Sequence, residues 1–278
     1  MITLGKFNKL KVISQDHLGF ILNDDENVAV FLPKMEAPAD IKIDDEISVF
    51  VYSDADHDFI ATTREPFIQL NEFGCLRVKS VNDFGAFLDW GIPKDLFLPY
   101  AEQRSKMSAS QRHIVYLYFD ERSGRLAASA KIHKFINPNP TDIKIGQEVE
   151  LLIGDRSDLG QSVIVNNQYK GLVFENEIFK FTRKGDKTKG FVKFIREDGK
   201  LDILLEPIGF AKIEGSEQVI LDYLKKHNGF AEFNDESDPD DIKYEFQMSK
   251  KSFKKAIGIL FKKRLIKIEK DGIHLVQP

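Results

Sequence analysis

The sequence predicts a mainly β protein, in which three small barrels in tandem precede a C-terminal region of mixed helices and strands. Three observations predict this fold class: an internal repeat of about 65 residues, short strands rich in Val, Ile, Phe and Tyr within each repeat, and a tail whose apolar residues recur at helical spacing. The predicted domains are residues 1–64, 65–138, 139–210 and 213–278.

The repeat is anchored on a glycine that occurs once in each of the first three domains, at Gly19, Gly85 and Gly160. Twelve residues beyond each glycine lies an apolar strand centre, and forty-one residues beyond it the apolar core of a third strand begins. The residues at these two spacings are Phe31, Phe97 and Leu172, then Ile60, Leu126 and Leu201. Two spacings held in three segments indicate a triplicated unit.

Each repeat is predicted to be a five-stranded barrel of the OB type. A unit this small would leave open sheet edges unless the sheet closed on itself. The anchor glycine falls within a strand, where we expect it to permit the sharp coil that a small barrel needs.

The tail breaks the repeat and predicts three helices followed by a β-hairpin. Asp238–Pro239 and Ser249 are typical helix starts, and Lys270-Asp271-Gly272 suits a hairpin turn. The predicted helices span 216–228, 240–246 and 250–265, the last with an apolar face of Phe253, Ile257, Leu260 and Phe261, and the predicted strands span 266–269 and 273–276. This order is that of a winged helix, an α+β domain whose third helix corresponds to a recognition helix.

Composition is ordinary for a globular protein, but charge is distributed unevenly along the chain. The 278 residues carry a formal net charge of −4 and a single cysteine, Cys75, which excludes an intrachain disulfide. Residues 1–64 hold six Lys/Arg against twelve Asp/Glu, residues 243–278 hold ten against three, and an acidic run at 232–241 is interpreted as a solvated linker. A polyanion responds to such local fields. No apolar run of 18 residues and no signal-peptide pattern is present, so we expect a cytoplasmic protein.

Two segments carry a resemblance to known proteins. Val81-Asn82-Asp83-Phe84-Gly85-Ala86-Phe87-Leu88-Asp89 resembles the signature of the S1 RNA-binding domain, an OB-fold module. The tail from Met248 to Gly258, with Leu265-Ile266 and Gly272-Ile273, is similar to the conserved virulence factor B family. This resemblance covers essentially the whole chain. It implies three S1-like domains, a C-terminal winged helix, and RNA binding with effects on gene expression.

The three repeats depart from the S1 pattern to different degrees. Many S1 domains place a histidine fourteen residues past the anchor glycine, where this chain has Pro33, Pro99 and Phe174. The third repeat also has Leu159 and Ser162 where the second has phenylalanines. An aromatic platform is therefore expected only in the second repeat, where the candidate RNA-binding residues are Arg77, Lys79, Phe84 and Phe87. Phe87 could instead be barrel core, and Trp90 is interpreted as a rim residue.

Basic residues supply the other candidate contacts, since cations follow phosphates and interleaved aromatic rings stack on bases. In the third repeat the candidates are Lys180, Arg183, Lys184, Lys187, Lys189, Phe191, Lys193 and Arg196. On the third tail helix they are Lys250, Lys251, Lys254, Lys255, Lys262, Lys263 and Arg264. No Asn, Gln or Arg begins that helix, which weighs against base-specific reading of duplex DNA.

We therefore expect an RNA-binding regulator of gene expression that contacts single-stranded RNA mainly through the third barrel and the winged helix. We expect a monomer without a membrane partner, and leave the ribosome and the transcription machinery open as further partners. The scattered histidines and the absence of phosphate-cradling or nucleophile motifs predict neither a metal, nor a cofactor, nor an enzyme. Two alternatives stay open: a duplex-DNA-binding transcription regulator that uses the winged helix, and a protein-interaction adaptor without direct nucleic-acid binding.

Overall fold

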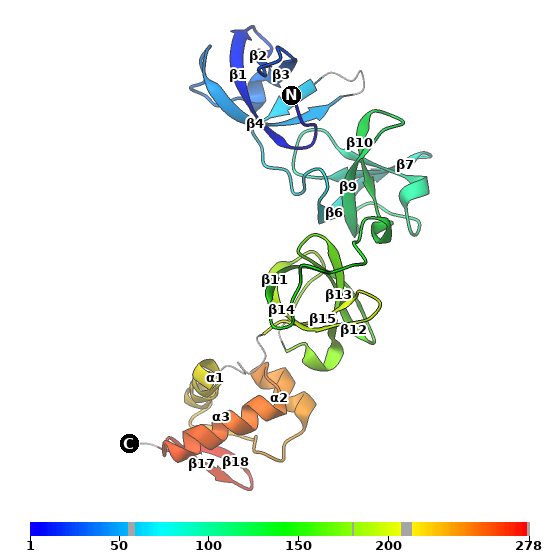
Figure 1. Ribbon diagram of the computed structural model, residues 1–278. Coiled ribbons are helices and arrows are strands. Elements are labelled where there is room, and N and C mark those ends of the chain that lie inside the picture. Colours follow the sequence, from blue (N-terminus) through cyan, green and yellow to red (C-terminus); the bar gives the residue numbers. More distant parts are fainter. Residues whose placement is uncertain (55–58, 180, 207–212, 277–278) are drawn as a thin grey trace. The chain divides into compact units, whose positions relative to one another are not determined.

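The computed structural model describes residues 1–54, 59–179, 181–206 and 213–276 (Figure 1). The chain forms two compact units, residues 1–136 and 137–278, and each is described by itself. The domain boundaries predicted at residues 64, 138 and 210 stay predictions, and the last of them lies outside the described residues.

The first repeat is a closed five-stranded barrel, as predicted. Its strands are paired in the order β1-β2-β3-β5-β4, and the barrel is closed by a short parallel pairing in which Phe31 faces Ile60. The strands are β1 (Phe7–Gln15), β2 (Gly19–Asn23), β3 (Ala29–Pro33), β4 (Glu46–Ser53) and β5 (Phe59–Thr62). Alternate residues point inward and form a core that includes Leu10, Val12, Leu22, Val30, Leu32, Val49 and Val51.

The second repeat has its five strands in the same order along the chain, but its sheet lacks the hydrogen-bonded closure expected of a barrel. Its sheet runs in the order β10-β9-β6-β7-β8, and β8 contacts β10 without a ladder between them. The strands are β6 (Phe73–Val81), β7 (Gly85–Asp89), β8 (Leu96–Pro99), β9 (Arg112–Asp120) and β10 (Arg125–Ser129). β8 has four residues, against five in β3 and six in the matching strand of the third repeat, so the closing seam is shortest here.

The third repeat is again a closed barrel, with strand order β11-β12-β13-β15-β14. The strands are β11 (Glu148–Ser157), β12 (Gly160–Val165), β13 (Tyr169–Phe174), β14 (Lys187–Ile195) and β15 (Leu201–Leu204). Parallel pairing of Gly171 with Leu201 closes it. The repeat positions found in the sequence thus lie on matching strands of all three units, which confirms the triplication.

The structure requires a glycine at the anchor position for a different reason than the sharp strand coil predicted from the sequence. A Cβ added at Gly19, Gly85 or Gly160 would lie 2.2, 2.3 or 2.1 Å from a carbonyl oxygen of the neighbouring strand. Real Cβ atoms do not approach backbone so closely. The glycine is therefore required because two strands meet at this point.

The C-terminal domain has the predicted winged-helix order, with an additional short strand. Its elements are α1 (Ile213–Lys226), β16 (Phe230–Ala231), α2 (Pro239–Phe246), α3 (Lys250–Lys262), β17 (Ile266–Glu269) and β18 (Gly272–Leu275). The side chains of Asp238 and Ser249 cap α2 and α3 by accepting hydrogen bonds from backbone N–H groups, as predicted. α3 ends three residues earlier than predicted, because Arg264 adopts a left-handed conformation (φ 58°) and the Leu265 N–H donates back to the Leu260 carbonyl.

Within the described ranges, no helix is long and apolar enough to cross a membrane.

Candidate nucleic-acid interface

The second barrel presents an aromatic face at the start of β7. Phe84 is 76% exposed, and the side-chain oxygen of Asn82 fixes its turn by accepting hydrogen bonds from the N–H groups of Phe84 (2.9 Å) and Gly85 (3.0 Å). Ala86 and Leu88, which alternate with Phe87, are fully buried. Phe87 is therefore on the outer face, and the interpretation of its side chain as barrel core is wrong.

Phe87 and Phe97 form a ring pair on this outer face. They are directly opposite each other in the β7–β8 pairing, and their ring centroids lie 5.3 Å apart at an angle of 46°. Both are half-buried and, with Phe84, line a pocket of about 550 Å³. Apolar rings at a pocket, with one ring freely exposed, are what a base needs in order to stack. Trp90 also lines the pocket but is 2% exposed, so it is not a rim residue.

The two predicted cations of the second barrel are exposed and ion-paired. Arg77 contacts Asp89 at 3.1 Å, and Lys79 contacts Asp95 at 2.6 Å. The hydrogen bond from Arg77 lowers the pKa of the Asp89 carboxyl, so the pair is charged at neutral pH. If these cations bind RNA, a phosphate must replace the carboxylate with which each is now paired.

The third barrel carries more cations, and most of those described also have acidic partners. The pairs are Lys184–Asp155, Lys189–Glu148, Lys193–Glu177 and Arg196–Asp202, with separations of 2.7, 2.6, 2.5 and 2.6 Å. Lys187 is exposed at the start of β14, Phe191 is half-buried in the same strand, and Lys180 lies outside the described residues. The local excess of positive charge is therefore smaller than the sequence of 180–200 implied, because the acids come from other segments.

An aromatic centre that the sequence did not identify lies on this barrel. Lys193 Nζ and the guanidinium carbon of Arg196 are 6.0 and 5.5 Å from the centroid of the Phe174 ring. Arg183 lies 5.4 Å over the ring of Phe181, which is 71% exposed. The signal for Phe174 was its place fourteen residues past Gly160, where we noted only the missing histidine.

The lysines of α3 lie opposite its buried face of Phe253, Ala256, Ile257 and Leu260. Phe261, predicted to belong to that face, is 54% exposed instead, although its neighbour Leu260 in the same turn is fully buried. Lys254 pairs with Asp235 (3.4 Å), Lys263 pairs with Glu217 (2.6 Å), and Lys250 donates to the Glu236 carbonyl (3.1 Å). Among described residues no ion pair involves Lys251, Lys255, Lys262 or Arg264.

The acidic run at 232–241 is therefore more than the solvated linker that was expected. Its Asp235 and Glu236 contact α3 lysines, and its last residues cap and begin α2. Acidic side chains at the start of a helix interact favourably with the helix dipole, and this explains the presence of part of the negative charge in the run.

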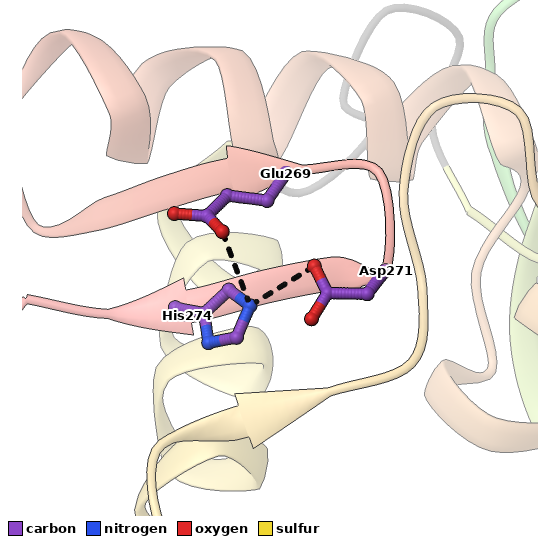
Figure 2. A group of neighbouring side chains, drawn as sticks. All are labelled: Glu269, Asp271 and His274. Atoms are coloured by element: carbon purple, nitrogen blue, oxygen red, sulfur yellow. Dashed lines mark hydrogen bonds and ion pairs between the residues drawn. The ribbon is translucent and has the colours of Figure 1, made fainter.

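Three side chains at the end of the β17–β18 hairpin converge, as Figure 2 shows: Glu269, Asp271 and His274. His274 Nε2 lies 3.2 Å from Asp271 and 4.0 Å from Glu269. The sequence reading found no metal-ligand spacing among the histidines. The spatial grouping arises because the hairpin turn brings β18 back beside β17, with His274 paired to Lys267 and Gly272 to Glu269.

Family models match the first and last domains of the chain, and full-length relatives match nearly all of it. Residues 4–64 match the family model of the S1 domain, and residues 218–275 match that of the CvfB-like winged helix domain. Conserved virulence factor B of Staphylococcus epidermidis is 29% identical, with 99% of this chain and 95% of the relative covered. That of Staphylococcus aureus is 26% identical, with 99% and 94% covered. The uncharacterized protein YitL of Bacillus subtilis is 29% identical, with 93% and 89% covered.

A solved structure is similar over the same length. It is a multidomain protein with nucleic acid binding domains from Streptococcus pneumoniae, 27% identical, with 98% of each chain covered and a TM-score of 0.45. The full-length relatives, the S1 domain and the family's own winged helix agree with the order of domains in the structure. This chain belongs to the conserved virulence factor B family.

Proposed function

We propose that this chain is an RNA-binding regulator of gene expression and not an enzyme, and that it holds single-stranded RNA by bases and phosphates at different domains. The observation that carries the proposal is the face of the second barrel, where exposed Phe84 and the Phe87–Phe97 pair line one pocket. Every base offers a face to stack on such rings, at roughly 1–3 kcal/mol per base. The resemblance of residues 81–89 to the S1 signature points the same way.

Most of the affinity is proposed to come from phosphate contacts of the third barrel and α3. Lys251, Lys255 and Lys262 project from α3 and can release counterions without first breaking an ion pair with a described residue. The paired cations of the third barrel, such as Lys189 and Lys193, contribute less, because phosphate must displace their carboxylates. Lysine and arginine at these positions favour backbone contact over sequence reading.

Anisotropy of a labelled single-stranded RNA, measured over a salt series with duplex DNA as competitor, tests the proposal. Phe84→Ala is expected to weaken binding by about 5- to 150-fold, the equivalent of roughly 1–3 kcal/mol. The matched control is Leu18→Ala, because Leu18 has the same place before the anchor glycine of the first barrel and is 61% exposed. Its effect should be small.

The other outcomes select between the alternatives. Stronger competition by duplex DNA than by unlabelled RNA would identify the winged helix as a duplex reader. No affinity for either nucleic acid at low salt would contradict the proposal and favour a protein-interaction adaptor.

A further inference from the structure

The pocket on the second barrel is completed by the first barrel. Tyr52 and Ser53, the last two residues of β4, line it together with residues of β7, β8 and β10. Its volume of about 550 Å³ falls within the roughly 300–1,000 Å³ of small-molecule sites. Residues of both β8 and β10 line it, and these two strands lack the ladder that the matching strands of the two closed barrels have.

The wall from the first barrel is held by specific contacts. The rings of Phe50 and Trp90 meet edge to face, with centroids 5.5 Å apart, and Phe50 and Tyr52 belong to the same buried cluster as the core of the second barrel. Lys94 Nζ donates a 2.8 Å hydrogen bond to the Ser53 carbonyl. Burial lowers the pKa of the Lys94 ammonium, so this carbonyl is a partner that the half-buried cation needs.

The lining of the pocket is mostly apolar. Phe84, Phe87 and Phe97 supply rings, and Leu96, Leu126 and Ala127 supply aliphatic surface. Asn82, Asp95, Asp120 and Arg125 also belong to the lining. The side chains of Asn82, Asp95 and Asp120 already accept hydrogen bonds from other residues of the second barrel. A mostly apolar lining with three aromatic rings suits the face of a base better than a phosphate.

We propose that this pocket takes one nucleotide, base first, and that the first barrel is part of the site. The inference rests on the proposed function and deepens it. The ligand is either a nucleotide within an RNA chain or a free mononucleotide, since the pocket's chemistry is the same for both. The acidic first barrel thereby gains a direct part in ligand binding.

The chain carries one tryptophan, and it lines the pocket, so its emission reports on occupancy. Titration of the full chain with AMP or CMP is expected to change Trp90 emission saturably. A twelve-nucleotide oligo(A) that produces the same change at lower concentration would indicate that the physiological source is RNA, and AMP alone would indicate a free nucleotide.

Two variants and one control separate the contribution of the second barrel's rings from that of the first barrel's wall. Phe97→Leu is expected to weaken AMP binding at least 5-fold, and Phe31→Leu, at the matching position in the first barrel, is expected to leave it unchanged. Lys94→Met keeps the aliphatic stem but removes the bond to Ser53, and should weaken AMP binding about 3- to 10-fold with intact far-ultraviolet circular dichroism.

The outcomes that overturn the inference are distinct from those that overturn the proposed function. Unchanged Trp90 emission with every mononucleotide, while labelled RNA still binds, would exclude the pocket as a nucleotide site and leave RNA binding intact. Undiminished AMP binding by Lys94→Met would exclude a part for the first barrel. Absence of both RNA and mononucleotide binding would contradict the proposed function itself.

Discussion

The second and third barrels share one framework but present different chemistry at matched positions. Both have the same strand sequence and the same close strand contact at their anchor glycines, Gly85 and Gly160. At the three positions on the outer face, the second barrel has Phe84, Phe87 and Phe97, and the third has Leu159, Ser162 and Leu172. The third barrel instead gathers Lys193 and Arg196 around Phe174. The fold determines where a ligand meets the barrel, and the side chains determine which part of the ligand is held.

The two faces should also respond differently to salt. Stacking of bases on apolar rings releases few counterions, whereas each phosphate contact by lysine or arginine releases counterions from the RNA. Ion pairs that pre-exist on the third barrel lower its net field further. Salt dependence is therefore the measurement that separates the contributions of the two barrels.

The largest expected effect tests the framework that the comparison assumes. Gly85→Ala places a Cβ 2.3 Å from the Leu98 carbonyl oxygen, which the strand pairing holds in place, and should destabilise the second barrel by about 3 kcal/mol. Urea unfolding followed by Trp90 emission measures the loss. Gly258→Ala in α3, where nothing lies within 4 Å of the added Cβ, is the control and should not shift this transition. An unshifted transition in Gly85→Ala would show that the strands can separate there.

The sequence was sufficient for the triplication, the strand positions and the winged-helix order, because apolar periodicity and turn residues are local signals. It could not show that the second barrel lacks a closing ladder, because that depends on how β8 meets β10 across the barrel. It also overestimated the free charge of the third barrel. Asp155, Glu148 and Asp202 are distant from their partners in sequence or on neighbouring strands, and only the folded chain brings them to Lys184, Lys189 and Arg196.

The candidate site, too, could be predicted only in part from the sequence. Phe84 was identified by its motif, but the pocket beside it was not, because two of its lining residues, Tyr52 and Ser53, come from another repeat. Nothing in the spacing of either repeat connects these positions.

The next largest effect concerns the phosphate contacts of α3. Neutralisation of Lys251, Lys255 and Lys262 to Gln should reduce the dependence of log affinity on log salt by about 2, at roughly 0.7 for each lysine on a single strand. A salt series of RNA anisotropy measures this slope. Lys9→Gln with Lys11→Gln in the first barrel is the control, because both lysines are already paired with acids there. An unaltered slope in the α3 variant would leave the third barrel as the main electrostatic site.

A smaller effect tests whether the third barrel stacks bases at all. Phe174→Leu retains apolar bulk but removes the ring beside Lys193 and Arg196, and should weaken RNA binding by about 1 kcal/mol, or about fivefold. The salt slope should not change, since no cation is lost. Unchanged affinity would mean that the third barrel binds through charge alone, which would make the contrast with the second barrel complete.

The smallest expected effect is a gain of function. Leu159 has the place of Phe84 on the third barrel and is 68% exposed, so Leu159→Phe should leave stability within about 0.5 kcal/mol. With cations nearby to hold the phosphates, the new ring should strengthen RNA binding about two- to fivefold, below the full value of roughly 1–3 kcal/mol per base because its neighbours Ser162 and Leu172 are not aromatic.

Leu18→Phe in the acidic first barrel is the matched comparison and should give no gain, because the excess of acids in residues 1–64 repels the backbone that must accompany the base. An equal gain from both substitutions would mean that the position before the anchor glycine determines base stacking whatever the charge around it. A gain from Leu159→Phe alone would mean that a ring contributes on this fold only where cations hold the adjoining phosphate, and that the second barrel depends on its neighbours for that charge.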